Sequence, residues 1–188
     1  MKNGYLKLSI YILALHALLL GAYSAIAADD MTMHRSYVGE LDGTGWTTAK
    51  STEGKFSVRL PNIFNDFTVR TKDPASPVER AFVVGTTLDG IKFMATRITY
   101  SKPDGANTYF NRFLNGGTFP AAKRTTGKFK GYPFAEIITS DDRQGTFYMR
   151  ALLIQEDVIT MTIEEPVAQK GVGAKLTTIF FESLTFDP

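Results

Sequence analysis

The sequence contains no cysteine. This absence excludes disulfide bonds, a thiol nucleophile, zinc–thiolate sites and a lipid-modified cysteine near the N-terminus. Histidine, the commonest metal ligand, occurs only at His16 and His34, and His16 lies in an N-terminal segment that we expect to be removed. A lone histidine lacks the partner groups of a nucleophilic triad or a metal site, so we interpret His34 as a solvent-exposed spectator. We expect no metal ion and no cofactor.

Motifs for phosphate binding and for acyl transfer are also missing. The glycines at 116–117 and 171–173 are too sparse for a phosphate cradle, and no strand–GxGxxG–helix or Walker-type pattern occurs. No serine stands in a nucleophile elbow. The sequence therefore identifies no catalytic residue.

The N-terminal segment has the order of a secretory signal peptide. Lys2 and Lys7 form a basic start, an apolar run follows from Leu8 to Ala22, and the segment ends in Ala25-Ile26-Ala27. The run is shorter than the roughly 20 residues of a membrane span, and no basic cluster follows it to retain it as an uncleaved anchor. We expect cleavage after Ala27, no transmembrane segment in the mature chain, and a periplasmic or secreted location.

The charge balance argues against nucleic acid as a partner. The whole chain has 21 basic and 19 acidic residues, and removal of residues 1–27 takes away two lysines and no acidic residue. The mature chain is then neutral overall, whereas affinity for nucleic acid depends on many phosphate-neutralising side chains. Residues 28–44 are polar and are interpreted as a loose leader before a single domain at residues 45–188.

Alternating and helical patterns within this domain predict an α+β fold. Residues 56–60 alternate as a half-buried strand, and Asp89-Gly90 predicts a tight hairpin between strands at 80–88 and 91–100. Further strands are expected at 121–129, 132–140, 146–155 and 157–164, with 147–154 central because it is apolar on both sides. Two helices follow from apolar stripes, at Ala106, Tyr109, Phe110 and Phe113 and at Val172, Leu176, Ile179, Phe180 and Leu184.

Two segments resemble a known family. Trp46 with Glu53-Gly54-Lys55-Phe56-Ser57-Val58-Arg59-Leu60-Pro61 is similar to the entry strand of PsbP-like domains, and Phe180-Phe181-Glu182-Ser183-Leu184-Thr185-Phe186 is similar to the end of small secreted bacterial relatives. The resemblance spans about residues 46–186. It implies an antiparallel β-sheet packed between helices, an α/β/α sandwich, and functions that are mostly non-catalytic, in accessory or binding proteins.

Two groups of charged residues are candidate binding sites. Arg97, Glu136 and Arg150 interrupt otherwise apolar strands, and a charge inside a strand must reach solvent, pair with another charge or line a cleft. Lys123, Arg124, Lys128 and Lys130 form a local basic group that would suit an anionic surface; alternatively, they protect an exposed sheet edge.

Adjacent acidic residues occur at 141–142, 156–157 and 164–165. Turn roles account for them, although a glycosidase also requires two carboxylates. The leading hypothesis is an exported accessory or binding protein whose partner is an envelope protein or a small ligand. A carboxylate-dependent hydrolase and an envelope-associated structural protein, binding through Lys123–Lys130, are the alternatives.

Overall fold

A computed structural model describes residues 30–117, 119 and 122–186; the predicted signal peptide lies outside them. The elements, in chain order, are β1 (Asp30–Val38), β2 (Thr47–Lys50), β3 (Phe56–Leu60), β4 (Phe64–Arg70), β5 (Val78–Leu88), β6 (Ile91–Tyr100), α2 (Gly105–Leu114), β7 (Lys123–Phe129), β8 (Tyr132–Asp141), β9 (Gly145–Ile154), β10 (Asp157–Glu165), the 3₁₀ turn η1 (Val167–Gln169), α3 (Val172–Glu182) and β11 (Thr185–Phe186).

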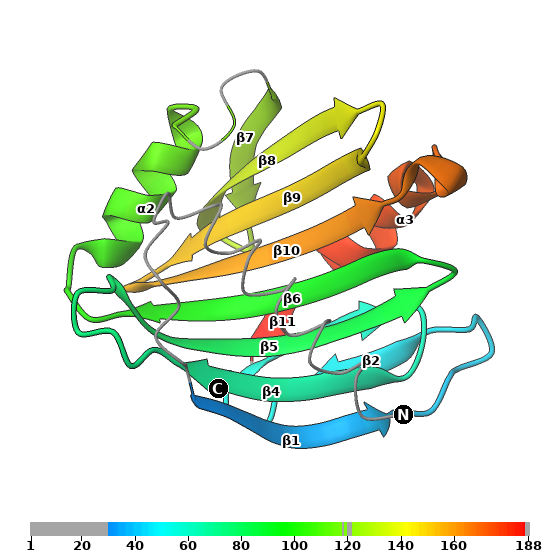
Figure 1. Cartoon of the computed structure of the whole chain (residues 1–188), viewed down its shortest axis with the longest axis horizontal. Helices are drawn as coiled ribbons and strands as arrows, with labels where there is room; N and C mark the ends of the chain where they lie inside the picture. The colour runs from blue at the N-terminus through cyan, green and yellow to red at the C-terminus, as the bar shows by residue number, and fades with distance from the viewer. Residues whose placement is uncertain (1–29, 118, 120–121, 187–188) are drawn as a thin grey trace.

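The strands form two antiparallel sheets. The larger one has eight strands in the order β1-β4-β5-β6-β10-β9-β8-β7, and the smaller one has three in the order β11-β3-β2. Figure 1 shows the large sheet from the front, with α3 and the small sheet behind it. The predicted strand at 147–154 is β9, which pairs with β10 on one side and β8 on the other. β9 is thus an interior strand, as expected, although it lies third from the β7 edge and β6 and β10 occupy the centre.

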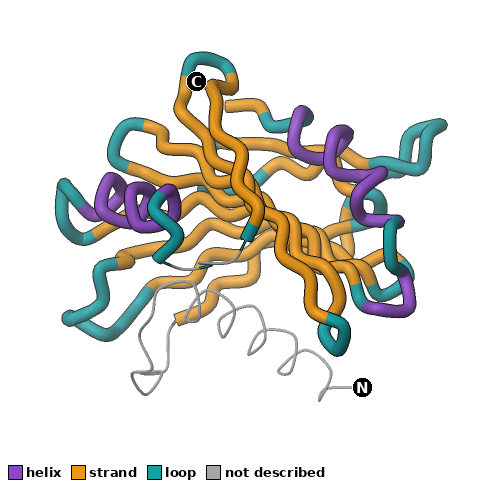
Figure 2. Tube along the Cα trace, turned by 90° about the horizontal axis from the view of Figure 1, so that it is seen from above, coloured by secondary structure: helices purple, strands orange, loops and turns teal. Residues whose placement is uncertain are grey.

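Side chains alternate between the two faces of the large sheet, and β10 shows what covers each face. Val158 packs in an apolar cluster with the α2 residues Tyr109 and Phe110. Ile159 and Met161 point the other way and pack with Phe180 of α3 and with the small sheet. The two helices thus lie on opposite faces of the sheet, as Figure 2 shows from above.

The expectation of a sheet packed between helices is too strong. A third apolar cluster, made of Phe67, Val69, Val83 and Met94, lies on the same face as α2, and no helix among the described residues contributes to it. On the other face, α3 shares the cover with the three-stranded sheet. For residues 30–186, as far as they are described, antiparallel sheet with two α-helices is therefore the correct description. Amphipathic stripes predict helices, but not how much of a sheet each helix covers.

The leader interpretation of residues 28–44 is wrong over residues 30–38, which form β1 at one edge of the large sheet. β1 pairs with β4, for example Met31 with Val69 and Met33 with Phe67. An edge strand keeps much of its surface in solvent, and Met31 and Met33 remain 44% and 45% exposed. The polar composition of this segment therefore reflects its edge position rather than a loose conformation.

A buried carboxylate fixes β1 and the β2–β3 turn to β4. Asp66 is fully buried; its Oδ2 accepts hydrogen bonds from the Thr52 backbone N–H at 2.9 Å and hydroxyl at 2.6 Å. Arg35 Nη2 on β1 donates to the same oxygen at 3.1 Å. A buried charge is stable only with such partners, so Asp66 serves the architecture.

The helix prediction at Ala106–Phe113 is confirmed, since all four stripe residues are buried in α2. The C-terminal stripe is only partly correct. Phe180 and Leu184 are buried, but Val172 and Ile179 are 38% and 41% exposed. Phe181 takes the inward position instead, which rotates the buried face of α3 away from the predicted stripe.

The Asp89-Gly90 hairpin is present, with φ angles of +49° and +86°. A β-branched side chain resists positive φ, so Gly90→Val is expected to destabilise the protein by about 1 kcal/mol or more. A Cβ at position 90 would meet only Pro166 Cγ, at 3.7 Å, so the cost comes from the backbone. Gly43→Val is the matched control, because its Cβ has no atom within 4 Å and its φ is not positive. Equal melting temperatures for the two variants would contradict this explanation.

Candidate functional site

Glu136 and Arg150, two of the predicted site residues, are directly opposite each other on β8 and β9. Arg150 Nε donates to Glu136 Oε1 at 2.6 Å. Its Nη1 donates to the Phe181 carbonyl at 3.1 Å, and its Nη2 donates to Glu182 Oε1 at 2.7 Å. The Arg150 side chain is only 8% exposed. The last two contacts join the sheet to the C-terminal end of α3, where the helix dipole favours a cation.

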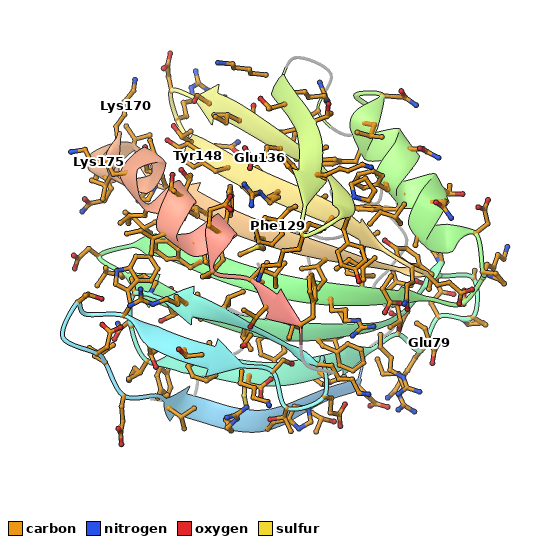
Figure 3. The ribbon with its side chains drawn as sticks, turned by 180° about the vertical axis from the view of Figure 1, so that it is seen from behind. Glu79, Phe129, Glu136, Tyr148, Lys170 and Lys175 are labelled. Carbon is orange, nitrogen blue, oxygen red and sulfur yellow. The ribbon has the colours of Figure 1, made fainter. Side chains whose placement is uncertain are left out.

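Aromatic rings complete the surroundings of Arg150. Its guanidinium carbon lies 4.8 Å from the ring centroid of Phe134, 5.2 Å from that of Phe181 and 5.3 Å from that of Phe129. Figure 3 shows Phe129 and Glu136 on the face of the large sheet that α3 covers. Because all three guanidinium nitrogens already have acceptors, this arginine is a structural bridge rather than a group held ready for a ligand.

Arg97 belongs to a different cluster. Its Nε lies 2.7 Å and its Nη2 2.6 Å from Asp157 Oδ2, while Nη1 donates to the Gly54 carbonyl at 3.1 Å. Arg97 and Arg150 share none of their described partners. Each of these mid-strand charges is paired, as predicted. Arg97, Glu136 and Arg150 nevertheless do not converge on one pocket.

The basic group of β7 does not form one surface. Lys123 and Lys128 are both exposed, but their odd and even positions place them on opposite faces of the strand. Arg124 donates to the carbonyls of Phe113, Ala122 and Phe119 and so ties β7 to the end of α2.

Lys130 follows β7 in the turn to β8, and it also has a structural contact. Its Nζ donates to the Leu184 carbonyl at 2.8 Å and lies 5.3 Å from the Phe129 ring centroid. The four basic residues of the predicted Lys123–Lys130 group therefore do not form one binding surface. Lys123 and Lys128 lie on opposite faces of β7, and Arg124 and Lys130 donate to backbone carbonyls.

His34 is not the exposed spectator that the sequence suggested. Its side chain is 13% exposed, and its Nε2 lies 2.8 Å from Thr68 Oγ1. The Thr68 hydroxyl donates to Glu53 Oε2 at 3.1 Å. These three residues form a structural hydrogen-bond chain between β1, β4 and the β2–β3 turn.

Each of the three carboxylate pairs has at least one member with a structural partner. Asp141 Oδ1 accepts the backbone N–H groups of Arg143 and Gln144 in the β8–β9 turn. Glu165 is buried and accepts the backbone N–H groups of Gly171 at 2.7 Å and Gly173 at 2.5 Å. Among the described residues, no group of three or more histidines and carboxylates could hold a metal ion.

A small hollow of about 220 Å³ separates α3 from β8 and β9. Glu136, Arg150 and Glu182 line it together with Tyr148. Burial raises the pKa of the Tyr148 phenol, and the nearby Glu165 carboxylate adds to this effect. The space is below the roughly 300 Å³ of ordinary ligand pockets, and its charged groups are already paired.

Two larger hollows lie on the other face of the sheet, where sequence reasoning placed no site. Lys92 on β6 and Glu164 on β10 are opposite each other, with Nζ 2.8 Å from Oε2, and both line both hollows. One hollow, of about 330 Å³, is lined by Tyr37, Asn65, Phe67, Met94 and Thr162, among others. The other, of about 440 Å³, is lined by Phe119, Ser140, Gln144 and Phe147, among others.

The 330 Å³ hollow arises from the strand register. Asn65, Gly85, Met94 and Thr162 are successive partners across β4, β5, β6 and β10. Gly85 contributes no side chain, so the surface of the sheet is depressed along this row. The depression lies between Phe67 on one side and the Lys92–Glu164 pair on the other. An isolated glycine within a strand was the only sequence signal for such a space, and the other three members of its row cannot be identified without the sheet order.

Comparisons with known proteins give likenesses of fold, without a matching family or curated relative. No protein-family model matches the chain, and no curated protein matches it. The fold is similar to the solution structure of cyanobacterial PsbP (CyanoP) from Synechocystis sp. PCC 6803, with a TM-score of 0.48 and 10% sequence identity over 80% of this chain and 98% of that one. The name of that structure is that of the family which the two sequence segments resemble, and at this identity the likeness concerns the fold alone.

None of the helices in the described part of the chain is both long and apolar enough to cross a membrane.

Proposed function

We propose that this protein is an exported, non-catalytic binding protein of the periplasm or cell envelope, and that it holds a small amphipathic ligand in the 330 Å³ hollow beside Lys92 and Glu164. The proposed export rests on the basic, apolar and small-residue order of residues 1–27. The observation that carries the binding role is the hollow itself, which is ligand-sized and built on paired strands of the large sheet.

The lining of this hollow favours a ligand with an apolar body and a polar end. Phe67, Met94 and Tyr37 offer aromatic and thioether surface, which adapts well to apolar groups. Asn65 and the Lys92–Glu164 pair supply donors and acceptors around it. A few polar groups set in an apolar wall are typical of small-molecule sites, where they fix the orientation of the ligand.

The groups that could act as a general acid or base are bonded to other parts of the protein, and this supports binding over catalysis. His34 is hydrogen-bonded to Thr68, Asp157 pairs with Arg97, and Glu165 accepts two backbone N–H groups at the start of α3. A general acid or base must instead be able to reach a substrate proton.

Binding of the neutral fluorophore N-phenyl-1-naphthylamine to the purified, exported protein tests this proposal. Thr87 is exposed, faces Lys92 across the β5–β6 hairpin and lines the hollow. Thr87→Trp is expected to fill the space and to weaken binding of the fluorophore about tenfold, which corresponds to about 1.4 kcal/mol. Thr125→Trp, at an exposed strand position on β7, is the matched control and should leave binding unchanged.

Two outcomes would count against the proposal. One is fluorophore binding that Thr87→Trp and Thr125→Trp affect equally, which would place the probe elsewhere. The other is turnover of a glycan or ester substrate that is abolished by replacing one carboxylate, which would favour the hydrolase alternative.

A further inference from the structure

The outer surface of η1 and α3 is both apolar and basic. Val167, Val172 and Ile179 are 47%, 38% and 41% exposed, and Lys170 and Lys175 are exposed beside them. Positions 172, 175 and 179 are spaced i, i+3 and i+7, so they share one side of the helix. We call Val167, Lys170, Val172, Lys175 and Ile179 the α3 surface. Figure 3 shows both lysines at the beginning of α3.

The α3 surface carries positive charge, and the segment that forms it contains no acidic residue. Residues 166–181 contain two lysines and no acidic residue. The acidic residues at the two ends of this segment are engaged elsewhere, because Glu165 accepts the N–H groups of Gly171 and Gly173 and Glu182 pairs with Arg150. The α3 surface is therefore complementary to an anionic partner.

The helix that presents this surface is firmly held. Phe180 and Phe181 are buried beneath it at 0% and 4% exposure, and Glu165 fixes its first turn. The exposed aliphatic side chains consequently project from a rigid element and are not required by the core.

We propose that the α3 surface docks this protein onto an anionic phospholipid membrane. Lys170 and Lys175 would meet lipid phosphates, while Val172, Ile179 and Val167 would enter the headgroup layer. Helices that lie on membranes combine lysines with apolar side chains in this way, and each lysine near an anionic leaflet adds to the attraction. The proposal is independent of the hollow beside Lys92, which belongs to the opposite face of the large sheet.

Co-sedimentation of the exported protein with vesicles tests the docking. Vesicles of phosphatidylglycerol mixed with phosphatidylcholine are expected to bind it, with less binding at high salt. Lys170→Gln with Lys175→Gln should lower binding about tenfold, and Val172→Ser with Ile179→Ser should also lower it. The melting temperatures of both double variants should stay close to that of the unchanged protein, because all four side chains are exposed.

Matched controls test whether vesicle binding depends on the α3 surface itself, rather than on the total charge or the total exposed apolar area of the protein. Lys102→Gln with Lys128→Gln removes the same charge from other exposed positions, and Leu41→Ser removes an apolar side chain that is 51% exposed elsewhere. Both controls should retain binding. Equal losses in the controls, equal binding to pure phosphatidylcholine vesicles, or capture of an acidic protein without any vesicle binding would each overturn the proposal.

Discussion

Replacing Arg150 by methionine is expected to lower the free energy of unfolding by about 3 kcal/mol. The substitution keeps most of the side-chain volume among three aromatic rings but removes every donor to Glu136, Glu182 and the Phe181 carbonyl. Removing one partner of a buried ion pair leaves the other charge poorly compensated. Because Glu136 and Glu182 are 27% and 51% exposed, water partly replaces the lost contacts, which keeps the cost below that of a fully buried pair.

Urea denaturation followed by tryptophan fluorescence measures this effect, since Trp46 is a buried member of the core. Arg143→Met is the control, because Arg143 is exposed in the β8–β9 turn; its expected change is within about 0.5 kcal/mol. An Arg150→Met variant as stable as the control would mean that the cluster is not a structural bridge, and would return Arg150 to the candidates for ligand binding.

Truncating Phe180 to alanine is expected to cost about 3–5 kcal/mol. The side chain is fully buried and meets the Phe93 ring edge-on, with centroids 5.7 Å apart and an interplanar angle of 89°. It also contacts the neighbouring ring of Phe181, 5.6 Å away. The loss combines the buried apolar area with the cavity left between α3 and the sheet.

Ile179→Ala provides the comparison, because the preceding residue on the same helix is 41% exposed. Its expected cost is below about 1 kcal/mol. Thermal unfolding of the two variants distinguishes the inner from the outer side of α3. A larger loss for Ile179→Ala would mean that Ile179, rather than Phe180, lies on the side of α3 that faces the core.

Local signals predicted most of the elements correctly. The Asp89-Gly90 turn needs two positive φ angles, and it closes β5 and β6 as expected. The α2 stripe and the alternation of β3 likewise depend only on neighbours a few residues away. β1 escaped detection because its pairing depends on β4, about 30 residues further along the chain, and little in its own composition indicates burial.

The candidate site was less predictable for the same reason. The sequence correctly singled out Glu136 and Arg150 as charges that need partners, and strand register made them partners of each other. Arg97 found Asp157 instead, a pair separated by 60 residues. The hollow beside Lys92 and Glu164 combines residues of several strands, each of which is unremarkable alone. A charged residue inside an apolar strand can be recognised from the sequence. A hollow between side chains cannot be recognised in that way, because it depends on which strands are neighbours in the sheet.

The pairing of β11 with β3 means that the small sheet can form fully only after the C-terminal strand has been synthesised. Thr185 lies opposite Ser57, and their hydroxyl oxygens are 2.7 Å apart across 128 positions of sequence. The Arg59 backbone N–H likewise donates to the Ser183 hydroxyl, 124 residues away. Contacts between such distant segments slow folding, because a long loop must close before they form. A nascent chain therefore cannot complete the small sheet beside β3 until residues 183–186 have been synthesised.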